Sequence, residues 1–515
     1  MSGTQRYLPH VVVFVASAGV MIVELVASRL VAKYLGNSLY TWTSVIGIVL
    51  GGISLGNWLG GRLADRFAPR QLIPWILLAA SVLTVLIVGL DIAVSALTRV
   101  LESGTISVGI LVRTLVLISV LFFLPSTSLG MVSPIMAKFA IAEAKGVGKA
   151  VGGIYAVGSL GSIGGTFLAG YLLIPAFGLA ANVLTVGIIL AALSLLMGGR
   201  RIVSGAWLLI VCALLVTNAP ERLLRTIIEA QSPGVHLLYE KDSAYSYIQV
   251  VEKGLPPERT LRLDALIHNK YRPGSPDELL YQYERIFAAL TESHSQQVSR
   301  TRAFSTLTLG GGAFTLPAYL ERHYPEARHS VVEIDPRVVR TAHRFFDLPD
   351  STSVHVTIED ARRYVEERQG QRQFDIIYCD AFNAYSVPAH LTTREFVLQL
   401  SRVLSSNGVL LANVIDILDL GRFLGAYVAT LQSVFPSTTV YMPQESSPNL
   451  RTTFVIAASR GWTAPAVLRD STGALVGASV PPAVLAKLTR GSPILTDDHA
   501  PVENLMAPVF LHSVR

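Results

Sequence analysis

The stretch FSTLTLGGGAFTLPAYL, residues 304–320, decides how the C-terminal half of this chain folds. A short apolar run ends at Leu309, and Gly310, Gly311 and Gly312 follow it before a helix-like pattern resumes. Glycine loses more conformational freedom on folding than any other residue. Three in succession therefore indicate a tight turn or a backbone that another group approaches closely.

Strand-like segments recur after this turn and alternate with helix-like segments. They cover residues 304–309, 329–334, 354–358, 374–380, 408–414 and 452–458. Strands that alternate with helices predict a mostly parallel, doubly wound sheet, in which a ligand lies beyond the carboxyl ends of the strands. The glycines then form a nucleoside-binding turn, although a structural loop explains three glycines nearly as well.

Acidic residues at successive strand ends favour the binding turn. Glu333 and Asp335 follow the second strand, about 20 residues beyond the glycines, where a carboxylate accepts hydrogen bonds from ribose hydroxyls. Asp360 and Asp380 follow the next two strands. A single acid at a strand end is commonly a helix cap. Acids at three consecutive strand ends, together with the glycines, indicate a site.

The first half of the chain has a different composition. The whole chain of 515 residues is 51% hydrophobic and 15% charged, a balance typical of membrane proteins, and residues 10–217 account for the excess. The net charge of +6 is scattered, so no nucleic-acid partner is expected. Cys212 and Cys379 are too few for a disulfide framework, and no His or Cys spacing fits a metal site.

Six segments of the first half are apolar and long enough to cross a bilayer, which is therefore an expected partner. They lie at residues 10–32, 40–60, 73–95, 107–134, 152–175 and 181–198, and a shorter seventh lies at 202–218. Glycines are frequent in these segments, as expected where helices approach closely in lipid. The pattern predicts an all-α polytopic bundle of about seven segments.

The loop after the second segment, GGRLADRFAPR, resembles the loop between helices two and three of the major facilitator superfamily. The matching residues are Gly61, Leu63, Ala64, Asp65 and Arg66. The resemblance covers half of such a transporter at most, and it implies a cytoplasmic loop, as the local arginines do. Further basic residues that predict cytoplasmic loops are Lys138, Lys145, Lys149, Arg200 and Arg201. If the seventh segment also crosses, the second half lies outside the cytoplasm.

Four ionisable residues fall within the apolar segments: Glu24, Arg29, Asp91 and Arg113. Charge is costly in lipid, so such residues are functional candidates. The alternative is structural: Glu24 pairs with a neighbour such as Arg113, while Arg29 and Asp91 reach the interface. A single half-bundle lacks the usual repeat architecture of a transporter, which favours the structural alternative.

Residues from about 240 to 460 resemble the spermidine synthase family of polyamine aminopropyltransferases. LRLDALIHN (261–269) resembles that family's Leu-Asp-Gly strand, SPDELLYQYE (275–284) its Asp-Glu and Tyr-Gln-Glu segment, and GGGAFTLP (310–317) its Gly-Gly-Gly-Asp-Gly-Gly turn. The resemblance implies a small antiparallel β-sheet followed by a Rossmann-like nucleoside-binding domain. It also implies a role in polyamine biosynthesis, with S-adenosylmethionine or its decarboxylated form as substrate and no metal.

The resemblance assigns residues to roles. Asp380 is the expected catalytic base, Glu333 the ribose-binding acid and Asp360 the adenine-contacting acid. The expected nucleoside site consists of Gly310, Gly311, Gly312, Ala313, Glu333, Asp335, Asp360 and Ala361, and the expected substrate site of Asp264, His268, Asp277, Tyr281, Gln282, Asn383 and Tyr385. The expected domains are a helix bundle at 1–218, a linker at 219–234, a small sheet with a helix at 235–300, and a Rossmann-like catalytic domain at 301–515.

Several positions depart from the family pattern. Ala313 replaces an Asp that would hold the donor's ammonium, His268 replaces a Gln, Tyr283 a Glu, and Asn383 an acid. Without an acid at 313, the site is expected to tolerate the carboxylate of intact S-adenosylmethionine. Four functions remain open: alkyl transfer to an amine, acceptor-free lyase cleavage to methylthioadenosine and homoserine lactone, methyl transfer, and nucleoside sensing that regulates the membrane half.

Location and assembly complete the expectations. ILTDDHAPVENL (494–505) either borders the pocket or forms a capped turn. S-adenosylmethionine is made in the cytoplasm, so the catalytic domain is expected on the cytoplasmic side of the cell (inner) membrane. The family resemblance also implies a possible homodimer formed through the soluble domain.

Overall fold

The computed structural model describes two compact units. Its described residues are 3–36, 39–101, 110–143, 146–298, 304–371, 373–381, 387–444 and 446–512. Unit 1 comprises residues 1–234 with 241–244, and unit 2 comprises residues 235–240 with 245–515.

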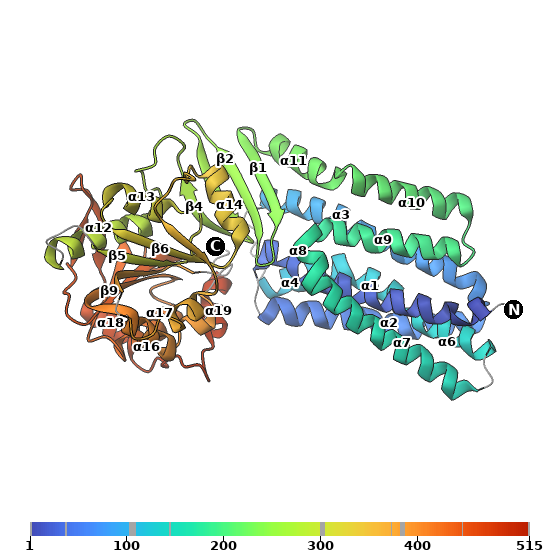
Figure 1. The fold of residues 1–515 in the computed structure, drawn as a ribbon. Coiled ribbons are helices and arrows are strands. Elements are labelled where there is room, and N and C mark those ends of the chain that lie inside the picture. The colour runs from blue at the N-terminus through green and yellow to red at the C-terminus, as the bar shows by residue number, and fades with distance from the viewer. Residues whose placement is uncertain are drawn as a thin grey trace. The chain divides into compact units, whose positions relative to one another are not determined.

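Residues 3–231 of unit 1 are mainly helical where the structure describes them (Figure 1). Its helices are α1 (Gly3–Leu35), α2 (Leu39–Arg66), α3 (Pro69–Leu101), α4 (Ile110–Ile118), the π-helix η1 (Ser119–Phe123), α5 (Leu124–Gly130), α6 (Val132–Glu143), α7 (Val147–Leu168), the π-helix η2 (Ala169–Leu173), α8 (Ile174–Phe177), α9 (Leu179–Leu196), α10 (Arg201–Val216) and α11 (Ala219–Gln231).

Among the described residues of unit 1, six stretches are long and apolar enough to span a membrane, judged by length and composition. They are Tyr7–Tyr34, Thr41–Arg66, Pro69–Ser95, Thr114–Ala142, Val147–Phe177 and Leu179–Leu196. A seventh candidate consists of α10 and α11, which are bent by 62° relative to each other. Since α10 contacts α9 and lies alongside it, the seventh segment packs as a member of the bundle (Figure 1).

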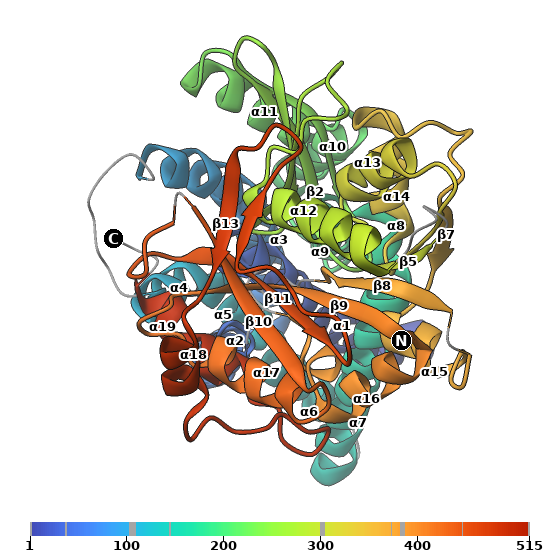
Figure 2. The same cartoon turned by 90° about the vertical axis from the view of Figure 1, so that its left-hand side faces the viewer.

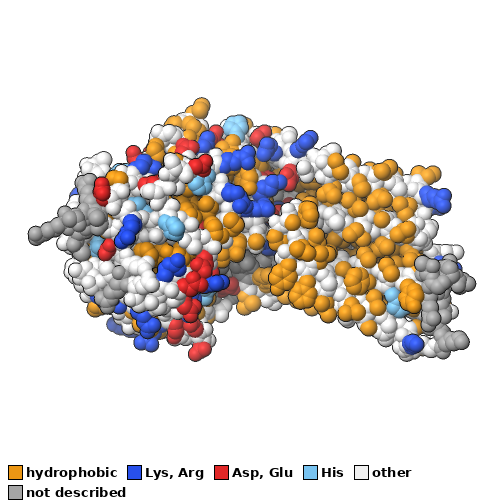
Figure 3. All heavy atoms as spheres, in the orientation of Figure 1, with side chains coloured by type: hydrophobic (Ala, Val, Ile, Leu, Met, Phe, Trp, Pro, Cys, Tyr) orange, Lys and Arg blue, Asp and Glu red, His pale blue; other side chains and the backbone are white. Residues whose placement is uncertain are grey.

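The surface of unit 1 is rich in apolar side chains, and its helices pack closely inside. Large apolar side chains such as Leu160 and Phe167 on α7 are more than half exposed, and hydrophobic side chains cover the face of the bundle seen in Figure 3. Inside, α1 and α7 approach closely. A Cβ atom added to Gly165 would lie 2.5 Å from the carbonyl oxygen of Ala18, so only glycine permits this approach.

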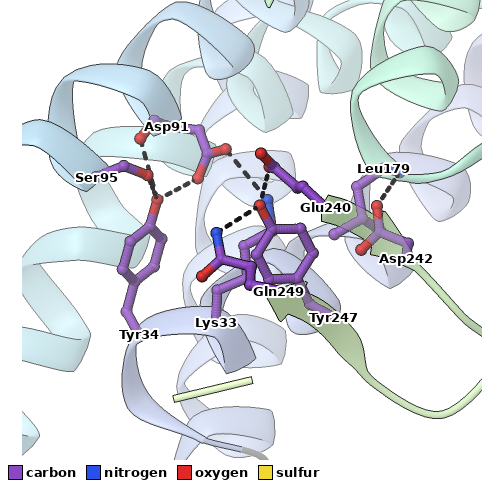
Figure 4. Close-up of polar contacts among 9 residues, drawn as sticks. All are labelled: Lys33, Tyr34, Asp91, Ser95, Leu179, Glu240, Asp242, Tyr247 and Gln249. Atoms are coloured by element: carbon purple, nitrogen blue, oxygen red, sulfur yellow. Dashed lines mark hydrogen bonds and ion pairs between the residues drawn. The ribbon is translucent and has the colours of Figure 1, made fainter. Parts of the chain in front are cut away.

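One polar cluster in unit 1 pairs two of its ionisable residues, Lys33 and Asp91. Lys33 Nζ lies 3.4 Å from Asp91 Oδ2, and Tyr34 Oη lies 2.5 Å from Asp91 Oδ1 and 2.5 Å from Ser95 Oγ (Figure 4). Asp91 is buried in this cluster. Its charge is therefore compensated by contacts between α1 and α3.

The remaining ionisable residues of the apolar segments have different surroundings. Arg29 Nη2 donates to the carbonyl oxygen of Ser243 at 2.7 Å. Glu24 Oε2 is enclosed and has no hydrogen-bond partner among the described residues. The side chain of Arg113, the partner expected for Glu24, lies outside the described part of the chain.

Unit 2 begins with a small antiparallel sheet of β1 (Val235–Asp242), β2 (Tyr247–Lys253), β3 (Glu258–Leu263) and β4 (Leu266–Tyr271), in that order. Tyr247 donates its hydroxyl to Glu240 within this sheet (Figure 4). Apolar side chains of the sheet, including Val250 and Leu261, pack against Ala313 and Val338. The small sheet therefore shares a core with the glycine turn and the helix that follows β6.

The larger sheet has the strand order β12-β13-β10-β11-β9-β8-β5-β6-β7. Its strands are β5 (Ser305–Leu309), β6 (Arg328–Glu333), β7 (His355–Ile358), β8 (Phe374–Cys379), β9 (Leu404–Asp416), β10 (Ser437–Pro443), β11 (Thr452–Ser459), β12 (Val467–Arg469) and β13 (Leu475–Ser479). Strands β5 to β9 pair in parallel, whereas β11 pairs antiparallel with β9, and β10, β12 and β13 continue the antiparallel pattern. The parallel part agrees with the expected doubly wound sheet, and the 452–458 strand joins it in the opposite direction.

Helices cover both faces of this sheet (Figure 2). They are α12 (Gln282–Val298), α13 (Thr315–His323), α14 (Pro336–Phe345), α15 (Ala361–Glu366), the 3-10 helix η3 (Ala389–Leu391), α16 (Arg394–Val403), α17 (Phe423–Gln432), α18 (Pro482–Thr489) and α19 (Val502–His512). Side chains of a strand alternate between faces, so Ile376 and Tyr378 of β8 join one core with Phe287 of α12. Ile377 joins the other core with Phe396 of α16.

Candidate active site

The glycine turn follows β5 and is shaped by neighbours within the protein. Gly310 and Gly312 have φ angles of +94° and +52°. A Cβ atom on Gly310 would lie 2.5 Å from the carbonyl oxygen of Asp380, and one on Gly312 would lie 2.3 Å from Asn269 Oδ1. Both positions therefore require glycine before any ligand is considered. The groups that closely approach the glycine backbone therefore include Asp380 and Asn269 of the protein itself.

Glu333, at the end of β6, holds this turn in place. Its Oε2 atom accepts hydrogen bonds from the backbone amides of Gly311 at 2.8 Å and Gly312 at 3.4 Å, and its Oε1 atom accepts one from Asp335 at 3.0 Å. Burial raises the pKa of this carboxyl, while the backbone hydrogen bonds act in the opposite direction. The carboxylate thus fixes the glycine loop directly.

Asp335 is buried beside Glu333. It is the N-cap of α14, because its Oδ1 atom accepts from the backbone amide of Arg337 at 2.8 Å. Its Oδ2 atom is enclosed and has no hydrogen-bond partner among the described residues. One carboxylate oxygen at this strand end therefore lacks a hydrogen bond from the described residues.

Asp360 occupies the corresponding position after β7. Its Oδ1 atom accepts from the backbone amides of Arg362 at 2.9 Å and Arg363 at 3.1 Å, which makes it the N-cap of α15. Its Oδ2 atom lies 3.2 Å from His390 Nε2. Ala361 is buried at the first position of α15. The capping alternative holds for Asp360, and its second oxygen lies at the partly exposed edge of the sheet.

Asp380 lies at the carboxyl end of β8, next to the glycine turn. Tyr283 donates its hydroxyl to Oδ2 at 3.0 Å, and Asn413 Nδ2 donates to Oδ1 at 2.8 Å. Burial raises the pKa of Asp380 to about 7, although both hydrogen bonds favour the ionised form. Part of its surface remains accessible. A partly accessible carboxyl with a pKa near neutrality suits a general base.

Two aromatic side chains of the 275–284 segment lie beside Asp380. The ring centroids of Tyr281 and Tyr283 lie 5.4 Å apart. Tyr281 donates its hydroxyl to the carbonyl oxygen of Ile267 at 3.0 Å, and burial raises its pKa to about 12. Gln282 is the first residue of α12. Tyr283, which replaces an acid of the family pattern, therefore contacts the expected base directly.

Glu284 is the residue of this region that the sequence analysis missed. It is 1% exposed, and its Oε1 atom accepts from Asn269 Nδ2 at 3.2 Å and from the hydroxyl of Thr315. Its Oε2 atom has no hydrogen-bond partner among the described residues. Burial raises its pKa to about 8. The only sequence signal is its place on the same face of α12 as the buried Phe287 and Thr291, at the i, i+3, i+7 spacing.

Three of the expected substrate residues lie in other surroundings. Asp277 is largely exposed, with Oδ1 at 2.8 Å from Arg322 Nε. Asp264 lies in the turn between β3 and β4, where its Oδ1 atom accepts from the backbone amide of Tyr247 at 2.9 Å. Burial lowers the pKa of His268 to about 4, so its imidazole is neutral near pH 7.

The other two expected substrate residues, Asn383 and Tyr385, lie outside the described residues. Within the described ranges, no group of three or more His, Cys, Asp or Glu side chains is arranged to hold a metal ion.

The C-terminal segment is tied to the same edge of the sheet. Arg362 holds the carboxylate of Asp497 with two hydrogen bonds, Nη1 to Oδ1 at 2.7 Å and Nη2 to Oδ2 at 2.5 Å, and Nη1 also donates to the carbonyl oxygen of His390 at 3.1 Å. Asp497 is therefore an ion-pair partner of α15. The segment borders the Asp360 end of the site through this pair.

Comparisons with known proteins find similarity in the C-terminal part of the chain. Residues 291–458 match the family model described as "Spermine/spermidine synthase domain". The chain is 38% identical over 143 residues to the polyamine aminopropyltransferase of Vibrio vulnificus (strain CMCP6), covering 27% of this chain and 46% of that protein. It is 28% identical over 254 residues to the N-terminal histidine N-methyltransferase of Emericella nidulans, covering 46% of this chain and 44% of that protein.

A solved structure, a probable spermidine synthase from Corynebacterium glutamicum ATCC 13032, aligns with a TM-score of 0.45 and 22% identity, covering 52% of this chain and 97% of that one. The chain spans less than half the length of each of the two curated relatives. Residues 291–458 are therefore similar to a spermine/spermidine synthase domain, and relatives of this part of the chain are named polyamine aminopropyltransferase.

Proposed function

We propose that this protein is a membrane-integrated enzyme of the aminopropyltransferase type. It acts on S-adenosylmethionine or its decarboxylated form, transfers an alkyl group to an amine, and releases methylthioadenosine. The observation that carries the proposal is Asp380, a partly accessible carboxyl with a pKa of about 7, hydrogen-bonded by Tyr283 and Asn413 beside the glycine turn. The match of residues 291–458 to the spermine/spermidine synthase domain supports it.

The proposed reaction needs a base in this position. The nitrogen lone pair of the amine forms a bond to the methylene next to the sulfonium, the carbon–sulfur bond breaks, and its electron pair stays on sulfur. Sulfur is thereby neutralised, and the nitrogen must lose a proton. Asp380 as carboxylate accepts that proton, and a pKa near the working pH suits this task.

The nucleoside is proposed to lie across the carboxyl ends of β5, β6 and β7. Glu333 keeps the glycine loop in shape, and the unpartnered Oδ2 atom of Asp335 is suited to accept a hydrogen bond from a ribose hydroxyl. Asp360 and Ala361 at the start of α15 are proposed to border the adenine. The site would thereby orient the sulfonium toward Asp380 without a metal ion.

Product analysis tests the proposed function. Purified protein is incubated with decarboxylated or intact S-adenosylmethionine, with and without putrescine, and the products are separated by chromatography. We expect methylthioadenosine and an alkylated amine that form only when amine is present. Methylthioadenosine released from the intact nucleoside without amine would indicate a lyase. S-adenosylhomocysteine would indicate methyl transfer, the chemistry in the name of the Emericella nidulans relative.

We also propose that unit 1 is integral to the inner membrane and that unit 2 faces the cytoplasm, where the sulfonium nucleosides are made. Six stretches of unit 1 have the length and composition of membrane spans. If α10 crosses the bilayer, the basic residues Arg66 at the end of α2, Lys138 in α6 and Arg200 before α10 argue that unit 2 lies outside the cytoplasm. A reporter enzyme fused after the C-terminus decides between them, because periplasmic activity of the reporter would overturn the cytoplasmic placement.

A further inference from the structure

His390 contacts the oxygen of Asp360 that is not used in capping α15. Asp360 Oδ1 accepts from the backbone amides of Arg362 and Arg363, whereas Oδ2 lies 3.2 Å from His390 Nε2. An ionised carboxylate only accepts hydrogen bonds, so the imidazole is the donor. The side chains of His390 and Asp360 are 47% and 37% exposed, and exposed pairs of this kind contribute little to stability. Helix capping and stability therefore do not account for this contact.

The backbone of His390 is held by the start of α15. Arg362 Nη1 donates to the carbonyl oxygen of His390 at 3.1 Å, and the same guanidinium makes two hydrogen bonds to Asp497. The Arg362 side chain is only 20% exposed, so this ion pair is partly shielded from solvent. The backbone amide of Asp497 donates in turn to Glu395 Oε2 of α16 at 3.0 Å. Four segments, η3, α15, α16 and the C-terminal segment, are thereby connected around His390.

The contacts of Asp360 set the plane of its carboxylate. The group can rotate about its bond to Cβ, and hydrogen bonds to both oxygens remove that freedom. Each carboxylate oxygen can accept two hydrogen bonds, and Oδ2 has His390 as its one donor among the described residues. A second donor can therefore approach Oδ2 from a direction that His390 determines. The exocyclic amine of adenine is a donor of this kind.

We propose that His390 is a positioning residue, which directs the free acceptor position of Asp360 Oδ2 towards the exocyclic amine of the bound adenine. The inference rests on the proposed function, in which Asp360 borders the adenine. His390 acts on the nucleoside only through Asp360 and takes no part in alkyl transfer. Because Arg362 and Asp497 hold the backbone of His390, the C-terminal segment contributes to selection of the base.

Isothermal titration calorimetry of the full chain in detergent tests the inference. Methylthioadenosine and an analogue in which hydrogen replaces the exocyclic amine are each titrated into the wild type and the variants. We expect His390→Ala to weaken binding of methylthioadenosine by about threefold to tenfold, the contribution of one hydrogen bond, and to leave binding of the analogue unchanged. His390→Gln retains an amide donor and should recover most of the loss. The matched control His355→Ala removes an exposed imidazole at the start of β7 and should change neither affinity.

Asp497→Ala supplies a second test that leaves His390 in place, in case His390→Ala folds poorly. This variant releases Arg362 and should also lower the preference for methylthioadenosine over the analogue. Equal weakening of both nucleosides by His390→Ala, or an unchanged preference in both variants, would overturn the inference. A wild type that binds the two nucleosides equally would overturn it as well, while the proposed function would stand. A wild type that binds neither nucleoside would refute the proposed function itself, which is a distinct result.

Discussion

Each unit contains a buried carboxyl group, and the surroundings of these two groups differ. In unit 1, Asp91 is enclosed with Lys33, Tyr34 and Ser95, and its carboxylate oxygens have close partners. In unit 2, one oxygen of Glu284 is enclosed without any partner among the described residues. A paired charge inside a bundle stabilises one arrangement of helices, whereas a buried carboxyl oxygen without a partner is costly. Glu24 is the exception in unit 1, since its Oε2 atom is also unpartnered among these residues.

The largest expected effect separates chemistry from binding in unit 2. Asp380→Asn removes the proposed base but keeps a side chain that can still bond to Tyr283 and Asn413. Turnover to methylthioadenosine should fall by about a hundredfold to ten-thousandfold, the usual contribution of a general base. Methylthioadenosine binding, measured by calorimetry, should persist. Turnover within tenfold of the wild type would remove Asp380 from the mechanism.

The next largest expected effect is a loss of stability when the ion pair between Lys33 and Asp91 in unit 1 is broken. Lys33→Met leaves Asp91 buried without its cation, and the free energy of unfolding should fall by about 3–5 kcal/mol. Thermal unfolding in detergent measures the change. The double variant Lys33→Met/Asp91→Leu removes both charges and should recover most of the loss. If the double variant were less stable than either single one, the pair would not be compensating within unit 1.

Loss of Glu333 should have a smaller effect on stability and a clear one on binding. Glu333→Ala leaves the amides of Gly311 and Asp335 without their acceptor, at a cost of about 1–3 kcal/mol. The glycine loop should lose its shape, and methylthioadenosine should bind more weakly. Glu333→Gln retains an acceptor oxygen and serves as the matched comparison. Unchanged nucleoside affinity in Glu333→Ala would contradict the placement of the nucleoside beside this loop.

The smallest effect concerns pH. The active form of Asp380 is the carboxylate, so kcat/KM should rise with pH through about 7. The hydroxyl of Tyr283 stabilises that carboxylate and lowers its pKa, so Tyr283→Phe should raise the pKa and move the rising limb to higher pH by roughly half to one unit. Rates at pH 7 should fall accordingly and recover at high pH. A limb that moves to lower pH would show that the hydroxyl does not favour the ionised form.

Much of the fold follows from local patterns. Apolar runs of sufficient length predict the spans, and alternating strands and helices predict β5 to β9 with their acids at the carboxyl ends. The direction of β11 does not follow, because a short apolar strand has the same pattern whether it runs parallel or antiparallel to β9. That pairing is decided by the connection through β10, which lies beyond the local sequence.

The site was less accessible to sequence reasoning. Asp380 and Glu333 are found because strand ends meet at one edge of a sheet. Asp277 has the same residue type and lies near Tyr281 in sequence, but it is largely exposed with Arg322. Glu284 is placed by helix phase, since it lies on the buried side of α12, and a charge on an apolar face is easily taken for part of a solvated surface. Position around a helix axis therefore mattered more than proximity along the chain.

The ion pair between Arg362 and Asp497, made by two hydrogen bonds, has a practical consequence for the design of shortened or extended versions of this protein. It connects a segment near the end of the chain to the start of α15, and the two residues are 135 positions apart in the sequence. Deletions that remove Asp497 would break its ion pair with α15, the helix that Asp360 caps. Tags or partner proteins attached after α19 would leave this ion pair intact. Fusion partners should therefore be attached after His512, and truncations should not remove residues before His512.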